Sequence, residues 1–166
     1  AILLTWFDQD GDDVSFEIVS DPEHGSLSGD APDLLYSPQS NFNGEDSFTF
    51  RAHDGEGYSD PGTITISVNP VNDSPVANPQ ILETPAGEPL SITLTGSDVD
   101  GDAPLSFLVS DAPLHGTISG TAPDLTYTPD TGYEGDDTFS FTVSDDVATS
   151  NPATISITVT PAGPIQ

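Results

Sequence analysis

The residues of this chain best suited to chemistry are aspartates that alternate along short acidic loops. One such loop, which contains Gly101, carries Asp98, Asp100 and Asp102, and a similar loop near the start carries Asp8, Asp10 and Asp12. Alternate carboxylates around a glycine can turn inward on one cation, and hard oxygen ligands suit Ca²⁺. The spacing is not that of an EF-hand, because no Glu follows at the twelfth position. The sequence therefore predicts oxygen-ligand metal sites, with solvated acidic turns as the plain alternative.

The whole chain is strongly acidic. Its 166 residues include 28 Asp and Glu residues and a single basic residue, Arg51, which gives a formal net charge of −27. Such a surface cannot neutralise phosphates, so nucleic acid is excluded as a partner, and an anionic membrane would repel it. Like charges oppose compaction, so we expect divalent cations or high external salt to offset them.

Catalytic chemistry finds little support in the sequence. The absence of Cys excludes a disulfide framework and cysteine-based catalysis. Carboxylate pairs could suggest a glycosidase, but in so acidic a chain such pairs are uninformative, and no serine lies in a nucleophile elbow. His24 and His115 each precede a Gly, which favours a conformational role over metal binding. We expect no enzyme, and no membrane insertion either, because no apolar stretch approaches the ~20 residues of a membrane span.

The sequence is one motif written twice. An offset of 91 positions aligns the two copies from Phe16 and Phe107 to the end. The aligned pairs include His24 with His115, Tyr36 with Tyr127, Asp46 with Asp137, Phe48 with Phe139, and Asp54 with Asp145. We predict two domains, residues 1–72 and 73–166, joined within a Pro-flanked linker at 70–75. The first copy has no counterpart of residues 79–90, so we expect it to lack an N-terminal strand.

Both copies have the pattern of β structure. Residues 154–160 alternate polar and apolar side chains at a period of two, and residues 63–68 do the same. Phe139, Phe141 and Val143 alternate with Ser140 and Thr142. No segment shows an apolar period of 3.6 residues. The sequence predicts an all-β protein of two tandem Ig-like Greek-key β-sandwiches, each of about seven strands.

Four segments, in the same order along the chain, resemble those of cadherin repeats. They are the linker at 68–75, the opening strand at 81–87, the Asp-x-Asp loop at 95–101, and the strands at 48–54 and 139–145 that end in aspartate. Both copies also carry His-Gly, then Tyr-x-Pro, then Gly-x-Asp-x-Phe-x-Phe. This second pattern is similar to bacterial cadherin-like tandem repeats of the dystroglycan-type or VCBS-like groups. The resemblance covers nearly the whole chain.

The resemblance implies a Ca²⁺ site at the linker between the repeats. Its metal ligands would be Asn72, Asp73, Ser74, Glu83, Asp98, Asp100 and Asp145, with Asp8, Asp10, Asp54 and Asp102 in second rank. Pro70 stands where cadherin linkers carry an aspartate, and Ser74 replaces an asparagine. We therefore expect one linker Ca²⁺ rather than three.

These features predict a non-catalytic, Ca²⁺-binding extracellular repeat module that Ca²⁺ stiffens at the interdomain linker. It would serve as a spacer or adhesion segment of a larger secreted or cell-surface protein, bacterial in origin. Its partners would be neighbouring repeats of the same polypeptide, or another cell-surface copy. The alternative is a polysaccharide-binding accessory module of a secreted carbohydrate-active enzyme, in which an exposed Trp6, Tyr58 or Tyr133 stacks on a sugar ring.

Overall fold

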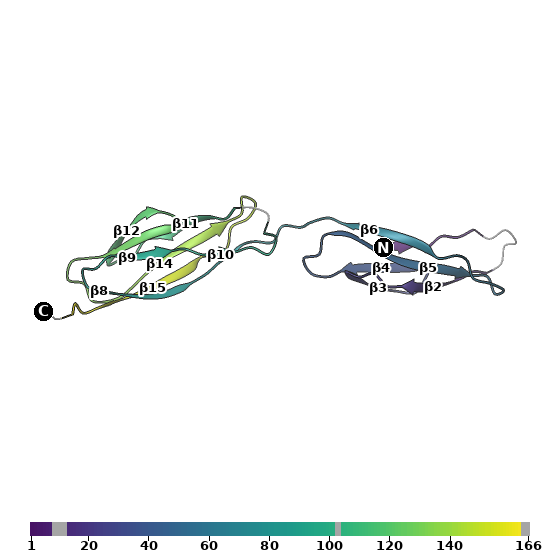
Figure 1. Ribbon diagram of the computed structural model, residues 1–166, viewed down its shortest axis with the longest axis horizontal. Coiled ribbons are helices and arrows are strands. Elements are labelled where there is room, and N and C mark those ends of the chain that lie inside the picture. Colours follow the sequence, from purple (N-terminus) through teal and green to yellow (C-terminus); the bar gives the residue numbers. More distant parts are fainter. Residues whose placement is uncertain (8–12, 102–103, 164–166) are drawn as a thin grey trace. The chain divides into compact units, whose positions relative to one another are not determined.

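The computed structural model describes residues 1–7, 13–101 and 104–163. The chain divides into two compact units, Ala1–Val71 and Asn72–Gln166, called repeat 1 and repeat 2 below. In these described ranges every regular element is a β-strand, which confirms the all-β prediction (Figure 1). The same ranges contain no helix long and apolar enough to cross a membrane. The predicted ligands Asp8, Asp10 and Asp102 lie outside the described residues.

Repeat 1 is built from two small antiparallel sheets. One sheet has the order β1-β4-β3, with strands β1 (Ile2–Leu3), β4 (Asp33–Pro38) and β3 (Gly25–Ser28). The other has the order β2-β5-β6, with strands β2 (Ser15–Ser20), β5 (Gly44–His53) and β6 (Gly62–Val68). Their inward faces meet at Leu4, Leu34 and Phe48, which are the fully buried apolar side chains of this core.

Repeat 2 has a larger version of the same arrangement. One sheet has the order β11-β14-β15-β8, with strands β11 (Ser106–Asp111), β14 (Gly135–Ser144), β15 (Ala153–Thr160) and β8 (Gln80–Pro85). The second has the order β12-β13-β9, with strands β12 (Gly116–Thr121), β13 (Asp124–Pro129) and β9 (Leu90–Thr93). A short ribbon pairs β10 (Gly96–Ser97) with β7 (Val76–Ala77). Strand β8 is the exception to the antiparallel rule, because it runs parallel to β15.

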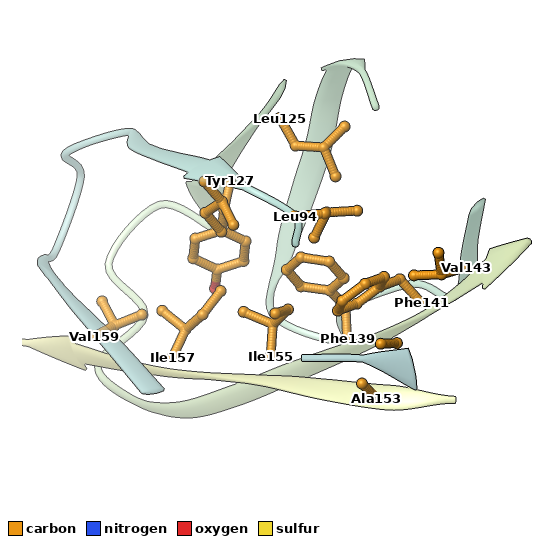
Figure 2. Packing of buried hydrophobic residues seen from close by; sticks show 12 residues of the cluster. Leu94, Leu125, Tyr127, Phe139, Phe141, Val143, Ala153, Ile155, Ile157 and Val159 are labelled. Atoms are coloured by element: carbon orange, nitrogen blue, oxygen red, sulfur yellow. The ribbon is translucent and has the colours of Figure 1, made fainter. Parts of the chain in front are cut away.

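The core of repeat 2 follows directly from strand alternation. Every second residue of β15 points inward, so Ile155, Ile157 and Val159 are 0–2% exposed while the threonines and serine between them face outward. Figure 2 shows these side chains beneath Leu94, Leu125 and Tyr127 of the facing layer, with Phe139 and Phe141 of β14 beside them. Burial of each such apolar side chain contributes about 1.5–3 kcal/mol. This layer of interdigitated side chains holds the two sheets together.

Candidate metal site at the linker end of repeat 2

Three segments of repeat 2 bring polar side chains to one place. Asn72 and Asp73 precede β7, Asp98 and Asp100 follow β10, and Asp145 follows β14. The pairing of β7 with β10 places the first two segments side by side. Hydrogen bonds then join the first segment to both of the others. Sequence reasoning predicted this grouping of the linker, the Asp-x-Asp loop and the end of the long strand.

Asp145 anchors one side of the group. Its side chain is 5% exposed, and its Oδ1 accepts hydrogen bonds from the backbone N–H groups of Val147 (2.8 Å) and Ala148 (2.6 Å). Its Oδ2 accepts a hydrogen bond from the Asn72 side-chain amide at 3.0 Å. The Ala148 N–H, and then the Asn72 amide, lower the pKa of Asp145, so the side chain is ionised at neutral pH.

The Asp-x-Asp loop forms the other side of the group. The backbone N–H of Asp73 donates to Asp100 Oδ2 at 2.7 Å, and the backbone N–H of Asp100 donates to Asp98 Oδ1 at 2.8 Å. Within the described part of the chain, Asp98 Oδ2 is the one buried side-chain oxygen or nitrogen without a hydrogen-bond partner. A buried carboxylate oxygen without a partner is costly, because it has lost its water and gained nothing in return. A cation ligand would remove that cost.

Two of the predicted ligands do not join this group. Ser74 is exposed on the linker and, unlike Asn72 and Asp73, makes no hydrogen bond to this group among the described residues. Glu83 is exposed on β8, where it lies opposite Thr158 of β15. Thr158 in turn lies opposite Asp136, near the start of β14. Asp145 follows the other end of β14. The prediction that Glu83 reaches the site therefore needs correction, because the parallel pairing of β8 with β15 carries this side chain to the opposite end of the sheet.

The grouped carboxylates are bridged by N–H donors and do not converge on a common point. Among the residues that the structure describes, no three Asp, Glu or His side chains lie close enough together to hold a metal ion. The three carboxylates are instead linked in a chain through Asn72 and the backbone of Asp73 and Asp100. One oxygen of each carboxylate in this chain therefore accepts a hydrogen bond from nitrogen, whereas Asp98 Oδ2 has no partner.

Repeat 1 shows which part of this arrangement is a general feature of the fold. Asp54, the counterpart of Asp145, accepts backbone hydrogen bonds from Glu56 and Gly57, both at 2.8 Å. The Gly57 N–H is the main cause of its lowered pKa. This aspartate therefore closes the same turn in both repeats. What repeat 2 adds is the contact with Asn72 on the linker.

A second pair of aspartates has a structural role that the sequence analysis missed. Asp137 is 5% exposed, and its carboxylate accepts hydrogen bonds from the Tyr127 hydroxyl (2.9 Å) and from three backbone N–H groups, those of Leu114, His115 and Thr138. Burial alone would raise the pKa of Asp137, but these donors outweigh it and lower the pKa. Asp46 makes the same four contacts in repeat 1, with Tyr36, Glu23, His24 and Ser47.

The His-Gly pair at the start of β3 and of β12, whose Gly is the first strand residue, belongs to the same network. A Cβ on Gly116 would collide with the ring of Tyr127, and one on Gly25 would collide with Tyr36. The preceding histidines stack on aromatic rings, His115 on Tyr133 with centroids 4.1 Å apart and His24 on Phe42 at 4.4 Å. The predicted conformational role of these histidines thus takes the form of ring stacking. The sequence did contain a signal for this network, because the spacing of His-Gly, Tyr and Asp is the same in both copies.

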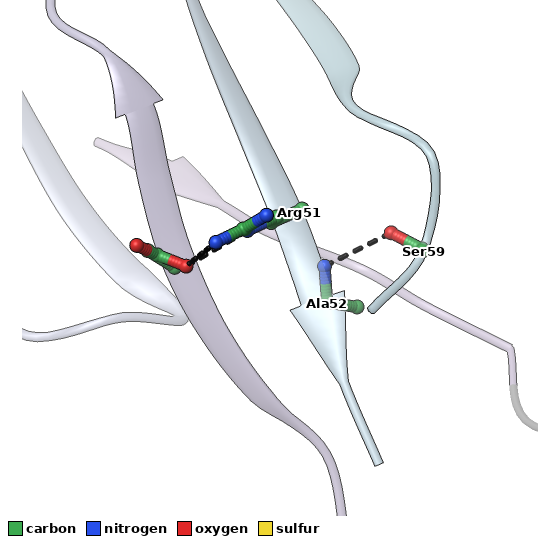
Figure 3. A network of polar contacts seen from close by, with 4 residues as sticks. Arg51, Ala52 and Ser59 are labelled. Atoms are coloured by element: carbon green, nitrogen blue, oxygen red, sulfur yellow. Dashed lines mark hydrogen bonds and ion pairs between the residues drawn. The ribbon is translucent and has the colours of Figure 1, made fainter. Parts of the chain in front are cut away.

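The aromatic residues considered for sugar binding lie mainly in repeat 1. Arg51 pairs with Glu17 of the neighbouring strand at 2.6 Å, and its guanidinium lies 3.8 Å above the centroid of the Tyr58 ring. Figure 3 shows the Arg51 contact beside the hydrogen bond between the Ala52 N–H and the Ser59 hydroxyl, 3.0 Å long. A cavity of about 240 Å³ lies alongside, lined by Trp6, Phe7, Val14, Ala52, Asp54, Gly57, Tyr58 and Ser59.

Comparison with known families identifies the fold. The bacterial Ig domain family matches residues 1–67 and again residues 72–158. The chain belongs to this family and contains two of its domains, so the prediction of tandem Ig-like sandwiches is confirmed. The fold is that of an Ig-like module.

The chain is also similar to segments of much larger proteins. Over 85 residues it is 36% identical to a sphingomyelinase of Mycobacterium tuberculosis, a match that covers 46% of this chain and 17% of that protein. An endo-fucoidan hydrolase of glycoside hydrolase family 107 is 28% identical, with a TM-score of 0.46 over 93% of this chain and 24% of the hydrolase. The first two extracellular domains of human mucin-like protocadherin match 92% of this chain and 86% of theirs, with 19% identity and a TM-score of 0.51.

These matches concern the fold of this chain and only a part of each larger enzyme. The protocadherin match supports a cadherin-like fold. The chain spans only 17% of the sphingomyelinase and 24% of the hydrolase. Tandem Ig-like modules of this kind occur within larger polypeptides.

Proposed function

We propose that this chain is a non-catalytic, Ca²⁺-binding module of a larger secreted or surface protein. One Ca²⁺ would bind to oxygens of Asn72, Asp73, Asp98, Asp100 and Asp145 in repeat 2. The observation that carries the proposal is the buried Asp98 Oδ2, which accepts no hydrogen bond although two other carboxylates are joined to the same network. A divalent cation is the partner whose charge and ligand preference fit that oxygen.

Small local changes would convert the hydrogen-bonded group into a cation site. Rotation of the Asn72 side-chain amide by half a turn would present its Oδ1 in place of the Nδ2 that now faces Asp145. Release of the Asp73 N–H would free Asp100 Oδ2. Asp145 is already held ionised, with Oδ1 engaged by the turn and Oδ2 directed at the linker. Water would complete the coordination, as is usual where a protein supplies few ligands.

The charge of the chain favours the same proposal. Its 28 acidic residues face one basic residue, so little within the protein can neutralise the loop carboxylates. A Ca²⁺ ion that ties Asn72 and Asp73 to Asp98, Asp100 and Asp145 would stiffen the linker segment that enters repeat 2. Extracellular modules bind Ca²⁺ at roughly 10⁻⁴–10⁻³ M, so the site would fill outside the cell and empty in the cytosol. The proposed role is therefore that of a spacer that stiffens after export.

Calorimetric titration and thermal unfolding of the full chain at constant ionic strength test this proposal. Binding to the folded state alone should stabilise repeat 2 by about 2.7 kcal/mol when free Ca²⁺ is 100-fold above Kd. Asp98→Asn should weaken Ca²⁺ binding by at least about tenfold, because it removes a charged ligand. Asp130→Asn is the matched control, because it removes one charge from an exposed side chain outside the group.

Two outcomes would contradict the proposal. Equal stabilisation by Mg²⁺, or by NaCl at matched ionic strength, would identify the aspartates as a salt-adapted surface without a specific site. Equal losses of binding in the Asp98→Asn and Asp130→Asn variants would show that Ca²⁺ associates with the acidic surface in general. A Ca²⁺-specific effect confined to the Asp98 variant would support the site.

A further inference from the structure

Strand β11 forms an open edge of the larger sheet in repeat 2. It pairs with β14 on one side, and no strand in the described part of the chain pairs with its other side. Near its centre is the outward-facing Leu108, whose side chain is 68% exposed and lies opposite Thr142 of β14. Strand β2 holds the same place in repeat 1, at the edge of the sheet β2-β5-β6. Open edges can pair with a further strand, so natural proteins usually protect them.

The hydrogen bonds at the end of β14 show which main-chain groups of β11 face the open side. The N–H of Val143 donates to the Ser150 hydroxyl at 2.9 Å, and its C=O accepts from the Ser150 N–H at 2.8 Å, so both groups point away from β11. Phe107 lies opposite Val143 in a non-hydrogen-bonded pair, and its own N–H and C=O therefore point away from β14. By the alternation of antiparallel pairing, the N–H and C=O of Val109 do the same, whereas those of Leu108 bond to β14.

The two repeats protect this edge differently. In β2 the residue at the position of Leu108 is Glu17, whose carboxylate pairs with Arg51 of β5 at 2.6 Å. A strand with a charge at this position repels a second copy of itself, because like charges directly opposite each other are destabilising. In β11 the segment 105–110 reads Leu-Ser-Phe-Leu-Val-Ser, with no charged residue although the chain carries 28 acidic ones. Repeat 2 therefore has an exposed leucine where repeat 1 has a protecting charge.

The surface beside Leu108 is also uncharged. The outward residues of the two neighbouring strands carry hydroxyl groups, namely Thr138, Ser140 and Thr142 on β14 and Thr154 and Ser156 on β15. The acidic residue of β11 is Asp111 at the end of the strand, beyond a β-bulge that follows Val109. A second copy that approaches this edge meets hydroxyl groups and an apolar side chain. Repulsion between the copies then comes from more distant charges, which salt screens beyond about 8 Å at 0.15 M.

We propose that β11 is a self-association edge, at which two copies of this chain pair their β11 strands antiparallel about a two-fold axis at Leu108. Phe107 of each copy lies opposite Val109 of the other in this register, and these residues supply the main-chain hydrogen bonds. The two Leu108 side chains meet across the axis as a non-hydrogen-bonded pair, with Cα atoms about 4.5 Å apart. Each Asp111 lies opposite Leu105 of the other copy, so the two acidic residues stay at opposite ends of the paired strands.

The association through this edge is weak and closed. Pairing of two short strands buries less than the roughly 1,200–2,000 Å² of stable protein interfaces, so the contact between single copies is transient. Many copies displayed on two facing surfaces would hold together by multivalency, as weak repeated contacts do. A two-fold contact uses the same patch on both copies, so it gives dimers and no filaments. No residue of the proposed metal site takes part, so the two proposals can fail separately.

Sedimentation equilibrium of the full chain without Ca²⁺ tests the proposal. At about 0.5 M NaCl we expect monomers near 10 μM and a substantial fraction of dimers towards 1 mM, with fewer dimers at low salt. Leu108→Glu should weaken dimerisation by at least about tenfold, because it places like charges opposite each other. The variant should keep its thermal stability, since repeat 1 has Glu17 at the same position. Ile81→Glu is the matched control, because Ile81 is 88% exposed on β8 at the opposite edge of the same sheet.

Amide hydrogen exchange locates the pairing within the strand. In the dimer the amides of Phe107 and Val109 should exchange at least about tenfold more slowly than in the monomer, because they become bonded to the second copy. The amide of Leu108 already bonds to β14 and should keep its exchange rate. The amides of Phe16 and Ile18 in β2 are the internal control and should not change either, because Glu17 prevents that edge from pairing with itself.

Three results would overturn the inference. The first is a chain that stays monomeric at about 1 mM in high salt. The second is an equal loss of association in the Leu108→Glu and Ile81→Glu variants, which would assign it to exposed apolar side chains in general. The third is slowed exchange elsewhere than in β11, or growth into larger oligomers, which would show a contact that does not close on a two-fold axis. Slowed exchange confined to the Phe107 and Val109 amides would support the proposed edge.

Discussion

Repeats 1 and 2 have the same motif but differ in how completely their cores are enclosed. In the described part of repeat 2, twelve buried residues form one cluster around Tyr127, Phe139 and Phe141. The described residues of repeat 1 include three buried apolar side chains in its core cluster, Leu4, Leu34 and Phe48, with others only partly covered. Matching patterns of strand residues thus give different degrees of burial. The comparison shows that the degree of burial of core residues in this fold depends on the covering strand β8 as much as on the residues that face inward.

The largest expected difference between the repeats is at the equivalent isoleucines Ile157 and Ile66. Ile157→Ala should lower the free energy of unfolding of repeat 2 by about 3–4 kcal/mol, because it leaves a cavity in a closed core. Ile66→Ala should cost repeat 1 only about 1 kcal/mol, because the site is already half open to water. Denaturant unfolding, followed by Trp6 fluorescence for repeat 1 and by NMR amide signals for repeat 2, measures both.

Equal losses in those two variants would contradict the comparison, since they would show that β6 is covered in solution.

The glycines beside the buried tyrosines should give the next largest difference. A Cβ on Gly116 would meet the Tyr127 ring and also lie 2.8 Å from the backbone carbonyl of Thr128, so Gly116→Ala should cost about 2–3 kcal/mol. Gly25→Ala should cost about 1 kcal/mol less, because its nearest contacts are with the half-buried Tyr36 side chain and none of them is with the backbone.

Gly87→Ala is a useful control for the glycine pair. A Cβ at Gly87 meets no atom within 4 Å, so its cost is limited to that of its positive φ of 82°. If Gly25→Ala proved as costly as Gly116→Ala, the tyrosine of repeat 1 would be as tightly held as that of repeat 2.

The smallest expected effect is on how the stability of the fold changes at acidic pH. Asp137, Asp46 and Asp145 have lowered pKa values in the folded state, so each stabilises the fold above the ordinary aspartate pKa of about 3.9. That stabilisation is lost as the pH falls through the folded-state values. Protonation of exposed carboxylates relieves charge repulsion, so stability should first rise as the pH approaches about 4–5 and then fall below it.

The Asp137→Asn variant tests whether Asp137 contributes to the loss of stability at acidic pH. The variant should be less stable at pH 7 and should show a shallower loss between about pH 4 and pH 2, because one of the titrating groups is gone. If the variant lost stability as steeply as the original chain at acidic pH, other carboxylates would be the cause of that loss. At the alkaline end, burial and the Asp46 contact raise the pKa of Tyr36 from 10.0 to about 12. Its contribution to stability is therefore fully present below pH 10 and is lost as the pH rises from there through about 12.

Much of the fold could be predicted from the sequence because strand alternation is a local property. The pattern at residues 154–160 gives both the strand and its buried face, and the inward residues are the ones found in the core. The offset between the copies transfers each assignment from one repeat to the other. The sequence also predicted that the loops of Asp98, Asp100 and Asp145 lie together, because these residues follow recognisable strands, and hydrogen bonds through Asn72, Asp73 and Asp100 connect them. Their binding of Ca²⁺ stays a prediction.

Other features depended on pairing that a linear pattern does not encode. Glu83 was placed with the metal ligands from its position in a motif, whereas the parallel register of β8 with β15 carries it to the other end of the sheet. Asp137 was one acidic residue among 28 in sequence terms. Its structural role depends on the folded chain, which places the Tyr127 hydroxyl and three backbone N–H groups within hydrogen-bond distance of its carboxylate.

The sequence by itself determined the all-β class, the duplication and the acidic character of the protein, because these follow from period, offset and composition. Only the tertiary structure decided which aspartates are structural and which oxygen lacks a partner, because hydrogen bonding depends on segments far apart in the chain. It also decided how deeply the isoleucines of each repeat are buried. Burial depends on what lies across from a residue, so identical isoleucines in β6 and β15 end in different surroundings.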